Sequence, residues 1–340
     1  MNALVWTGIG KVELRDRPEP RIGDDRSVLV DVEASGICCS SDVYIVEGRF
    51  GEKFGVILGH ETAGTVRETG GAVDGLAPGQ RVVLDPTVVC GTCAQCRAGR
   101  GNLCPHRTFI GLDADGGLAE GIVAPAANWM PVPDGLAAGE ACLAELLACA
   151  IHAADEIGEL PGPGILITHA GIMAYLFQQV FASRWPGEKI MAVGRAGAGL
   201  ELLREAGAHV ADRSDRKWPD AAREFFGDEG PSLIVEQTGD PGTIAATMGL
   251  IAPRGVFFAF DIIGDAVPFP FTTMALREVR VLTATGCAGR LPRALALMRD
   301  GTVDVARAVS HRAAPENMEE AFRMTMERDG THVKTVVSFE

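Results

Sequence analysis

A cluster of four cysteines constrains this chain more than any other feature of its sequence. They lie at Cys90, Cys93, Cys96 and Cys104, with the spacing C-x2-C-x2-C-x7-C. Four thiolates at this spacing can close a tetrahedral zinc site, although an iron–sulfur cluster uses similar ligands. The small and polar residues between them argue against unrelated core cysteines or a disulfide pair. Because a closed site has no room for a substrate, the chemistry of the chain must lie elsewhere.

Length and composition narrow the class of protein. The chain has 340 residues, of which 47% are hydrophobic, and this size favours two domains. No apolar run approaches the roughly 20 residues that span a bilayer. The net charge of −14 argues against a nucleic-acid or anionic-membrane partner. Nine cysteines in largely metal-like spacing, and no signal-like segment between Met1 and Lys11, predict a cytoplasmic protein.

The hydrophobic pattern changes near residue 140. The first part is rich in short strand-like runs bounded by Gly, Pro and Asp, namely Val28–Glu33, Ala63–Arg67 and Arg81–Asp85. The mostly apolar stretch Ala138–Ile157 predicts a helix, and strands and helices then alternate. The predicted strands are Ile165–Thr168, Ile190–Val193, Leu233–Gln237 and Gly255–Phe260, and the predicted helices are Met173–Ser183, Gly199–Ala206 and Thr243–Leu250.

Such alternation predicts a parallel, doubly wound sheet over residues 151–283. A final helix at Arg290–Arg299 and a strand at Thr335–Phe339 return to the first domain. We therefore expect residues 1–150 and 284–340 to form one domain.

A second set of metal-ligand residues comes from separated segments. Adjacent cysteines, Cys38 and Cys39, precede Gly59-His60-Glu61, and Glu145 lies much further along the chain. A cysteine, a histidine and a carboxylate are suitable ligands for a catalytic zinc with an open fourth position. A metal there acts as a Lewis acid on a substrate oxygen, and Ser41 could hydrogen-bond that oxygen and relay its proton.

These motifs together resemble the zinc-dependent medium-chain alcohol and polyol dehydrogenases. The resemblance runs nearly end to end, and the Glu145–Ala148 stretch is similar to the sorbitol and threonine dehydrogenase branch. The other matching segments are Ala3–Trp6, Val12–Leu14, Gly59–Gly64, Pro78–Val82 and Asp115–Glu120. The resemblance implies a GroES-like, β-rich catalytic domain and a Rossmann cofactor domain. It also implies that the four-cysteine lobe holds zinc.

Carried over residue by residue, the resemblance implies a catalytic zinc held by Cys39, His60 and Glu145, with Glu61 as an exchangeable ligand. The family order of Cys, any residue, Ser or Thr, then Asp fits Cys39 to Asp42, whereas Cys38 fits the preceding Gly-Ile-Cys. The segment has one residue too many, and we take Cys39. A histidine that often completes the proton relay is replaced by Tyr44. A phenol titrates near pH 10, so the relay is weaker or passes through water.

The coenzyme motif departs from the family pattern. The three glycine positions of G-x-G-x-x-G hold His169, Gly171 and Ala174. Gly171, together with Ile172 and Met173 at the start of the helix, is predicted to contact the coenzyme. After the second strand, Gly194 and Arg195 replace the acidic residue that NAD-preferring enzymes use. We therefore predict NADP(H) rather than NAD(H). The strand end that passes the nicotinamide in the family corresponds to Thr238 and Gly239.

The predicted activity is hydride transfer between a nicotinamide and a secondary alcohol or ketone, with a polyol, sugar or cyclitol suggested by Glu145. One catalytic and one structural zinc are expected per chain. Two alternatives remain: a redox-neutral enzyme that retains its nicotinamide, suggested by His169, and a noncatalytic binding protein with the structural zinc alone. The family forms homodimers and homotetramers, and strand edges in the cofactor domain suit such pairing.

Overall fold

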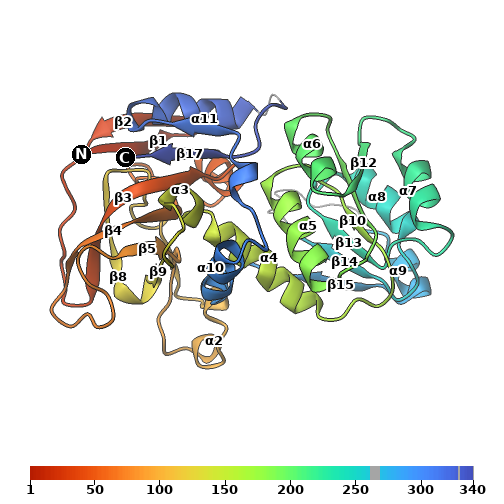
Figure 1. Cartoon of the computed structure of the whole chain (residues 1–340), viewed down its shortest axis with the longest axis horizontal. Helices are drawn as coiled ribbons and strands as arrows, with labels where there is room; N and C mark the ends of the chain where they lie inside the picture. Colours follow the sequence, from red (N-terminus) through yellow and green to blue (C-terminus); the bar gives the residue numbers. More distant parts are fainter. Residues whose placement is uncertain (261–268, 328–329, 340) are drawn as a thin grey trace. The chain divides into compact units, whose positions relative to one another are not determined.

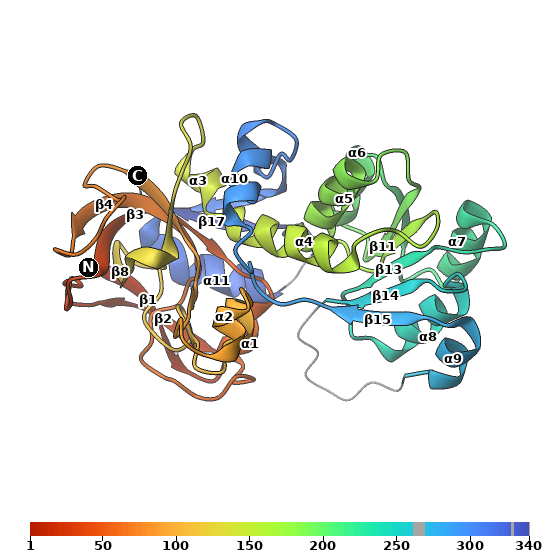
Figure 2. The same cartoon turned by 90° about the horizontal axis from the view of Figure 1, so that it is seen from below.

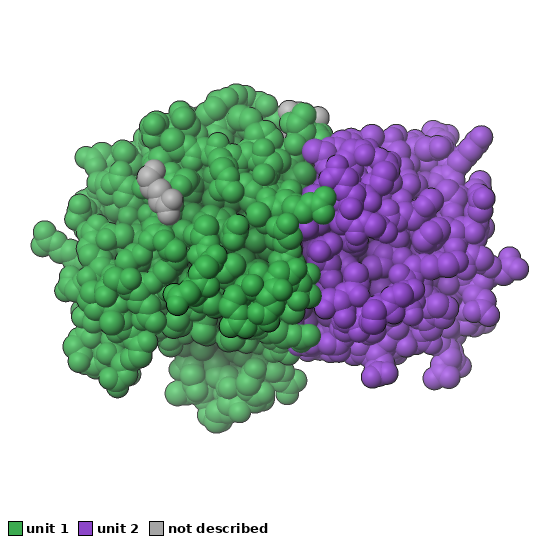
Figure 3. All heavy atoms as spheres, viewed as in Figure 1, with its two compact units in different colours: residues 1–148, 286–340 green, residues 149–285 purple. Residues whose placement is uncertain are grey.

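The computed structural model describes residues 1–260, 269–327 and 330–339 of the chain (Figure 1). The chain divides into two compact units (Figure 3). Unit 1 comprises Met1–Ala148 and Gly286–Glu340, and unit 2 comprises Cys149–Thr285. Among the described residues, no helix is long and apolar enough to cross a membrane.

Unit 1 is built on a mostly antiparallel sheet around the long strand β3 (Ser27–Ile37). Strand β3 pairs with β4 (Glu61–Thr69), with β8 (Gly121–Pro125) and with β17 (Thr335–Ser338). The sheet continues from β17 to β16 (His311–Ala313), and from β4 to β5 (Arg81–Leu84) and β9 (Trp129–Pro131). The last strand of the chain therefore lies against an early one, which brings residues of both ends together at β3.

The remaining elements of unit 1 are short strands and helices around this sheet. The strands are β1 (Asn2–Gly8), β2 (Lys11–Asp16), β6 (Thr87–Val88) and β7 (Thr108–Phe109). The helices are α1 (Ser41–Val46), α2 (Ala94–Arg97), η1 (Gly101–Leu103), η2 (Ala126–Asn128), α3 (Ala138–Ala141), α10 (Leu291–Arg299), η3 (Ala306–Ala308), η4 (Pro315–Asn317) and α11 (Met318–Glu327). One apolar cluster around Trp6, Leu58 and Phe322 and another around Val30, Val66 and Trp129 form its core.

Unit 2 confirms the predicted doubly wound parallel sheet. Its strands lie in the order β12-β11-β10-β13-β14-β15 and are all parallel. Helices α5 and α6 cover one face of the sheet and α8 and α9 the other (Figure 2). The order reverses between β10 and β13, and dinucleotides bind outside the carboxyl ends of the strands at such a point.

The strands of unit 2 are β10 (Ile165–Ile167), β11 (Ile190–Gly194), β12 (His209–Asp212), β13 (Leu233–Glu236), β14 (Val256–Ala259) and β15 (Arg280–Thr283). Its helices are α5 (Ile172–Arg184), α6 (Ala198–Glu205), α7 (Trp218–Phe226), α8 (Pro241–Leu250) and α9 (Phe271–Arg277). The single helix predicted over Ala138–Ile157 is wrong in one respect, because it is divided into α3 and α4 (Ala144–Ile157). No proline marks the break within this mostly apolar stretch.

Candidate metal centres and coenzyme crevice

The four cysteines of the lobe converge as the spacing predicts. The sulfur atoms of Cys90 and Cys104 are 3.5 Å apart, as are those of Cys93 and Cys96. The Cys90–Cys96 and Cys93–Cys104 sulfur pairs are each 3.9 Å apart. A tetrahedral zinc with Zn–S bonds of about 2.3 Å separates its sulfur atoms by about 3.8 Å. The lobe therefore fits a closed four-sulfur zinc site.

The protonation of these thiols also suits a cation. The backbone N–H of Thr92 lowers the pKa of Cys90 to about 6, whereas burial raises the pKa of Cys96 to about 12. The Cys93 sulfur accepts the N–H of Cys96 and thereby caps α2. Backbone donors thus support negative charge in the lobe, and a bound cation displaces the protons that remain.

A second cluster of ligand atoms lies where β3 ends and β4 begins. The sulfur of Cys38, a ring nitrogen of His60 and a carboxylate oxygen of Glu61 all lie within 4.8 Å of one another, and all three residues are buried. Tetrahedral ligands at about 2.0–2.3 Å from zinc are under about 4 Å apart. Small side-chain adjustments would therefore close a Cys-His-Glu site with an open fourth position.

The cluster contains Cys38 in the place where the sequence predicted Cys39. The backbone N–H of Cys38 donates to Asp42 Oδ2 at 2.8 Å, and the N–H of Ser41 donates to the Cys38 sulfur at 3.3 Å. Both bonds fix the turn after β3 so that the first cysteine faces His60. Cys39 is half-buried and is not part of the cluster. The additional residue of this segment therefore lies between the clustered cysteine and Ser41-Asp42.

The carboxylate of the cluster also differs from the prediction. Glu61, predicted as an exchangeable ligand, lies beside Cys38 and His60, whereas the predicted ligand Glu145 belongs to no cluster with them. Glu145 is buried in the first turn of α4, and its Oε1 accepts the thiol of Cys287 at 3.2 Å. Cys287 carries no sequence signal, because a single cysteine after Thr285-Gly286 forms no recognisable pattern.

Asp42 orients the imidazole of the cluster. Its Oδ1 lies 3.0 Å from His60 Nδ1, and both side chains are buried. Burial disfavours the protonated ring, but the charge of Asp42 raises the pKa of His60 well above its usual value. An acidic partner at Nδ1 leaves Nε2 for a metal, and such a partner increases the basicity of the ligand.

Lys334 forms the other support of the cluster. Its Nζ lies 2.7 Å and 2.5 Å from the two carboxylate oxygens of Glu61, and it donates to the carbonyl of Ile37 at 2.9 Å. Burial opposes the charged form, but Glu61 raises the pKa of Lys334 above its ordinary value. A Cβ on Gly36, which pairs with Glu61 across β3 and β4, would lie 2.1 Å from Glu61 Oε2. Glycine thus leaves room for this ion pair.

The two residues predicted to relay the proton lie on α1, the helix that follows Cys38 and Cys39. Ser41 opens α1 and is half-buried, and Tyr44 lies one turn later. The guanidinium of Arg49 lies 4.3 Å from the centre of the Tyr44 ring. Their roles in proton transfer remain predictions.

In unit 2 the altered glycine loop connects β10 to α5. Gly171 is the N-cap of α5 in an extended conformation, and a Cβ there would lie 2.8 Å from Cε1 of the exposed His169. Ile172 and Met173 form the first turn of the helix, whose free N–H groups suit a phosphate. A Cβ on Gly194 would lie 2.2 Å from the Cβ of Ala170, so this glycine lets the loop approach β11.

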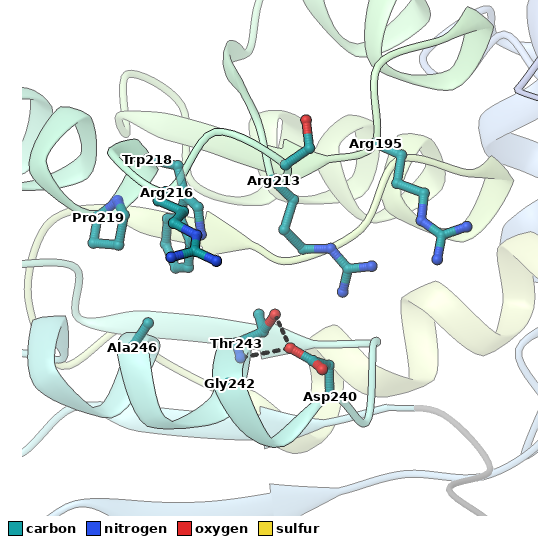
Figure 4. A pocket seen from close by; sticks show the side chains of 10 residues that line it. Arg195, Arg213, Arg216, Trp218, Pro219, Asp240, Gly242, Thr243 and Ala246 are labelled. Carbon is teal, nitrogen blue, oxygen red and sulfur yellow. Dashed lines mark hydrogen bonds between the residues drawn. The ribbon is translucent and has the colours of Figure 1, made fainter.

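A cavity of about 480 Å³ lies beyond the ends of β11 and β12 (Figure 4). Three arginines, Arg195, Arg213 and Arg216, line it together with Trp218 and Asp240. The N–H of Arg213 donates to the carbonyl of Gly194 at 2.7 Å, which places the two strand ends side by side. Arg213 and Arg216 were not identified from sequence, because charged residues in a loop usually form a solvated surface.

Comparisons with known proteins agree with this geometry. Residues 24–134 match the alcohol dehydrogenase GroES-like domain, and residues 180–300 match the family described as zinc-binding dehydrogenase. D-xylulose reductase A of Aspergillus oryzae is 27% identical over 347 residues, covering 99% of this chain and 96% of that protein.

Two solved structures are also similar over almost their whole lengths. Alcohol dehydrogenase TADH from Thermus sp. ATN1 is 25% identical, with a TM-score of 0.90 and 99% of each chain covered. A protein described as a zinc-binding dehydrogenase from Sinorhizobium meliloti 1021, bound to NADP, is 30% identical with a TM-score of 0.89. That match covers 99% of this chain and 98% of the other.

Proposed function

The chain belongs to the zinc-dependent medium-chain alcohol and polyol dehydrogenases, and we propose that it oxidises a polyol or sugar alcohol with NADP⁺ at a zinc held by Cys38, His60 and Glu61. It is an oxidoreductase that acts on CH–OH groups and uses zinc and a nicotinamide coenzyme. The convergence of the three buried ligand atoms within 4.8 Å is the observation that carries the proposed site.

The residues around the cluster have separate tasks in this chemistry. Zinc bound there supplies a Lewis acid that lowers the pKa of the substrate hydroxyl. Asp42 holds the imidazole of His60 in the ligand tautomer, and Lys334 offsets the charge of Glu61. Ser41 would accept the hydroxyl proton and pass it outward, and a bound nicotinamide would supply the acceptor for the carbinol hydrogen as hydride. An alcohol thus loses one proton and one hydride and becomes a ketone.

The arginine-lined cavity supports a preference for NADP(H). Arg195 and Arg213 both project over it from the ends of neighbouring strands, and Gly194 supplies no carboxylate to hold a ribose hydroxyl (Figure 4). Guanidinium groups bind phosphate through paired, charge-assisted hydrogen bonds. A 2′-phosphate in this cavity would therefore meet two or three positive charges.

The substrate class rests on the relatives and on the buried Glu145. A D-xylulose reductase is similar over nearly the whole chain, and Glu145 places a carboxylate within unit 1 beyond the three cluster ligands. Steady-state assays should compare xylitol and sorbitol with 2-propanol, each with NADP⁺ and with NAD⁺. We expect kcat/KM to be higher for the polyols and for NADP⁺, whereas exclusive use of 2-propanol would contradict the polyol assignment.

The zinc assignment is tested by metal analysis of two matched variants. We expect about two zinc ions per chain in the wild type and about one in Cys38→Ser, which should also lose turnover. Cys39→Ser is the control and should keep the wild-type zinc content. Loss of zinc from Cys39→Ser instead would place the ligand at the second cysteine. If all three proteins contained only one zinc ion per chain, the second zinc site would be excluded and only the four-cysteine site would remain.

A further inference from the structure

A buried carboxylate lies at the carboxyl end of β13, beside the point where the strand order reverses. Glu236 is 1% exposed. Its Oε1 accepts the N–H groups of Thr238 at 2.6 Å and Gly239 at 3.0 Å, and the hydroxyl of Thr238 at 2.5 Å. Its Oε2 accepts the hydroxyl of Thr168 at 2.6 Å. Four donors from two separate loops therefore hold one side chain.

Thr168 links this carboxylate to the glycine loop. It is the first residue after β10, and its backbone N–H donates to the carbonyl of Val235 at 3.0 Å. Its hydroxyl oxygen also accepts the N–H of Gln237 at 3.2 Å. The loop that leads to Gly171 and the loop after β13 are thus joined through Thr168 and Glu236.

These contacts change the role expected of Thr238 and Gly239. Both were predicted as coenzyme-binding residues, but their backbone N–H groups are directed at Glu236. A coenzyme phosphate cannot use these donors while the carboxylate holds them. The first turn of α5 after Gly171 supplies the other N–H groups at this edge of the sheet.

A charge buried at this position is costly unless it is fully hydrogen-bonded. Glu236 meets this condition, since both of its carboxylate oxygens accept hydrogen bonds from the two loops. The two loops joined by Glu236 border the crevice where a dinucleotide binds in proteins with this strand order. Loops held in the bound arrangement before binding lose less conformational freedom when the ligand arrives.

We propose that Glu236, acting with Thr168, is a positioning residue that fixes both loops of the coenzyme crevice and thereby sets coenzyme affinity. It reaches the coenzyme only through the loops it holds. The inference rests on the nicotinamide coenzyme occupying unit 2, and it adds a determinant of affinity that is distinct from the arginine-lined cavity.

The experiment measures the Kd for NADPH and for NADH in the zinc-loaded protein, with KM for the coenzyme and for the alcohol. Glu236→Ala should raise both coenzyme Kd values by about tenfold or more, because two N–H groups and two hydroxyls lose their acceptor. KM for the alcohol and the zinc content should stay unchanged. Glu236→Gln should remain within about threefold of wild type, since its amide oxygen still accepts from Thr238 and Gly239.

Thr168→Val tests the link without removing the carboxylate. It should raise coenzyme Kd by about threefold to fivefold, and in the Glu236→Ala background it should add less than it does alone, because coupled residues are not additive. Thr247→Val is the matched control: this buried threonine donates only within α8, to the carbonyl of Ile244 at 2.9 Å. Its loss should leave the Kd unchanged.

The outcomes separate this inference from the proposed function. Unchanged coenzyme Kd in a folded Glu236→Ala overturns the inference, as does equal weakening by Thr168→Val and Thr247→Val. If Glu236→Ala does not fold, Thr168→Val with a wild-type Kd overturns it. A wild-type protein that binds neither NADPH nor NADH removes the proposed function itself.

Discussion

Replacing Lys334 with methionine should destabilise unit 1 strongly, because the carboxylate of Glu61 then loses its buried cation. Both side chains are 0% exposed, and the ammonium lies within 2.7 Å of both carboxylate oxygens. Breaking a buried pair by removing one partner costs about 3–5 kcal/mol. Since whole domains are stable by only about 5–15 kcal/mol, this loss is a large part of the total. Zinc bound at the proposed site would partly replace the lost cation, so the loss should then be larger in chelator-treated protein.

Urea unfolding followed by tryptophan fluorescence measures this loss with and without chelator. The double variant Lys334→Met/Glu61→Gln should recover most of the stability, because no charge is then left buried alone. Lys53→Met is the matched control, since Lys53 pairs with Asp113 at a partly exposed site. An exposed pair of this kind contributes about 0–1 kcal/mol. A loss from Lys334→Met as small as that from Lys53→Met would refute the reasoning, and so would a double variant less stable than the single one.

The pH dependence of this pair has a definite sign. Glu61 raises the pKa of Lys334 above the ordinary value of 10.5, so the ammonium binds its proton more tightly in the folded protein. Its contribution is therefore complete below the unfolded-state pKa and is lost only as pH rises through the folded-state value. The wild type should therefore lose none of the stability that this pair contributes between neutral and mildly alkaline pH.

Asp42→Asn should weaken zinc binding at the second cluster by about 10–100-fold in competition with a chelator, with the four-cysteine zinc retained, because the imidazole of His60 loses its acidic partner. Arg213→Ala should raise the Kd for NADPH by about tenfold and leave the Kd for NADH unchanged. Fluorescence of the nearby Trp218 can report both Kd values, and equal effects on the two coenzymes would contradict a phosphate contact. We also propose that a second copy pairs with the edge strand β15, where Val281 is 42% exposed; Val281→Lys should shift the protein to monomer in light scattering, and an unchanged mass would exclude this edge.

The sequence predicted the central strands of unit 2 well and its edges poorly, for a physical reason. Strand β13 is buried along its whole length and forms the kind of continuous apolar run that the pattern detects. Strands β12 and β15 lie at the two edges of the sheet, and their partly exposed residues include His209 and Arg280. Because half-exposed strands contain charged residues, their sequences resemble those of the surrounding loops, and the hydrophobic pattern does not detect them.

The two metal sites also differ in how well the sequence predicts them, depending on how close their ligands lie along the chain. The four-cysteine lobe is recognisable from sequence because its ligands lie within one loop. The spacing of the cysteines along the chain is therefore enough to predict that their sulfur atoms converge. The second cluster depends on which cysteine the hydrogen bonds of Asp42 and Ser41 turn inward, and no motif states this. Lys334 lies 273 residues from Glu61, so only the pairing of β17 with β3 brings them together. The one sequence signal was a lysine within the otherwise β-branched run from Val333 to Val337.

With zinc bound at the proposed site, Lys334 would also set the net charge that the second cluster presents to a substrate. A thiolate, a neutral imidazole and a carboxylate together neutralise a divalent zinc, and such a centre would have little net charge to stabilise an alkoxide. The buried ammonium adds one positive charge beside Glu61, and this charge offsets the negative charge that Asp42 places beside His60. The ion pair that stabilises the sheet should therefore also lower the pKa at which a bound alcohol loses its proton. Lys334→Arg keeps the charge and should preserve the pH profile of kcat, whereas Lys334→Met should shift that profile to higher pH even where the protein remains folded and loaded with zinc.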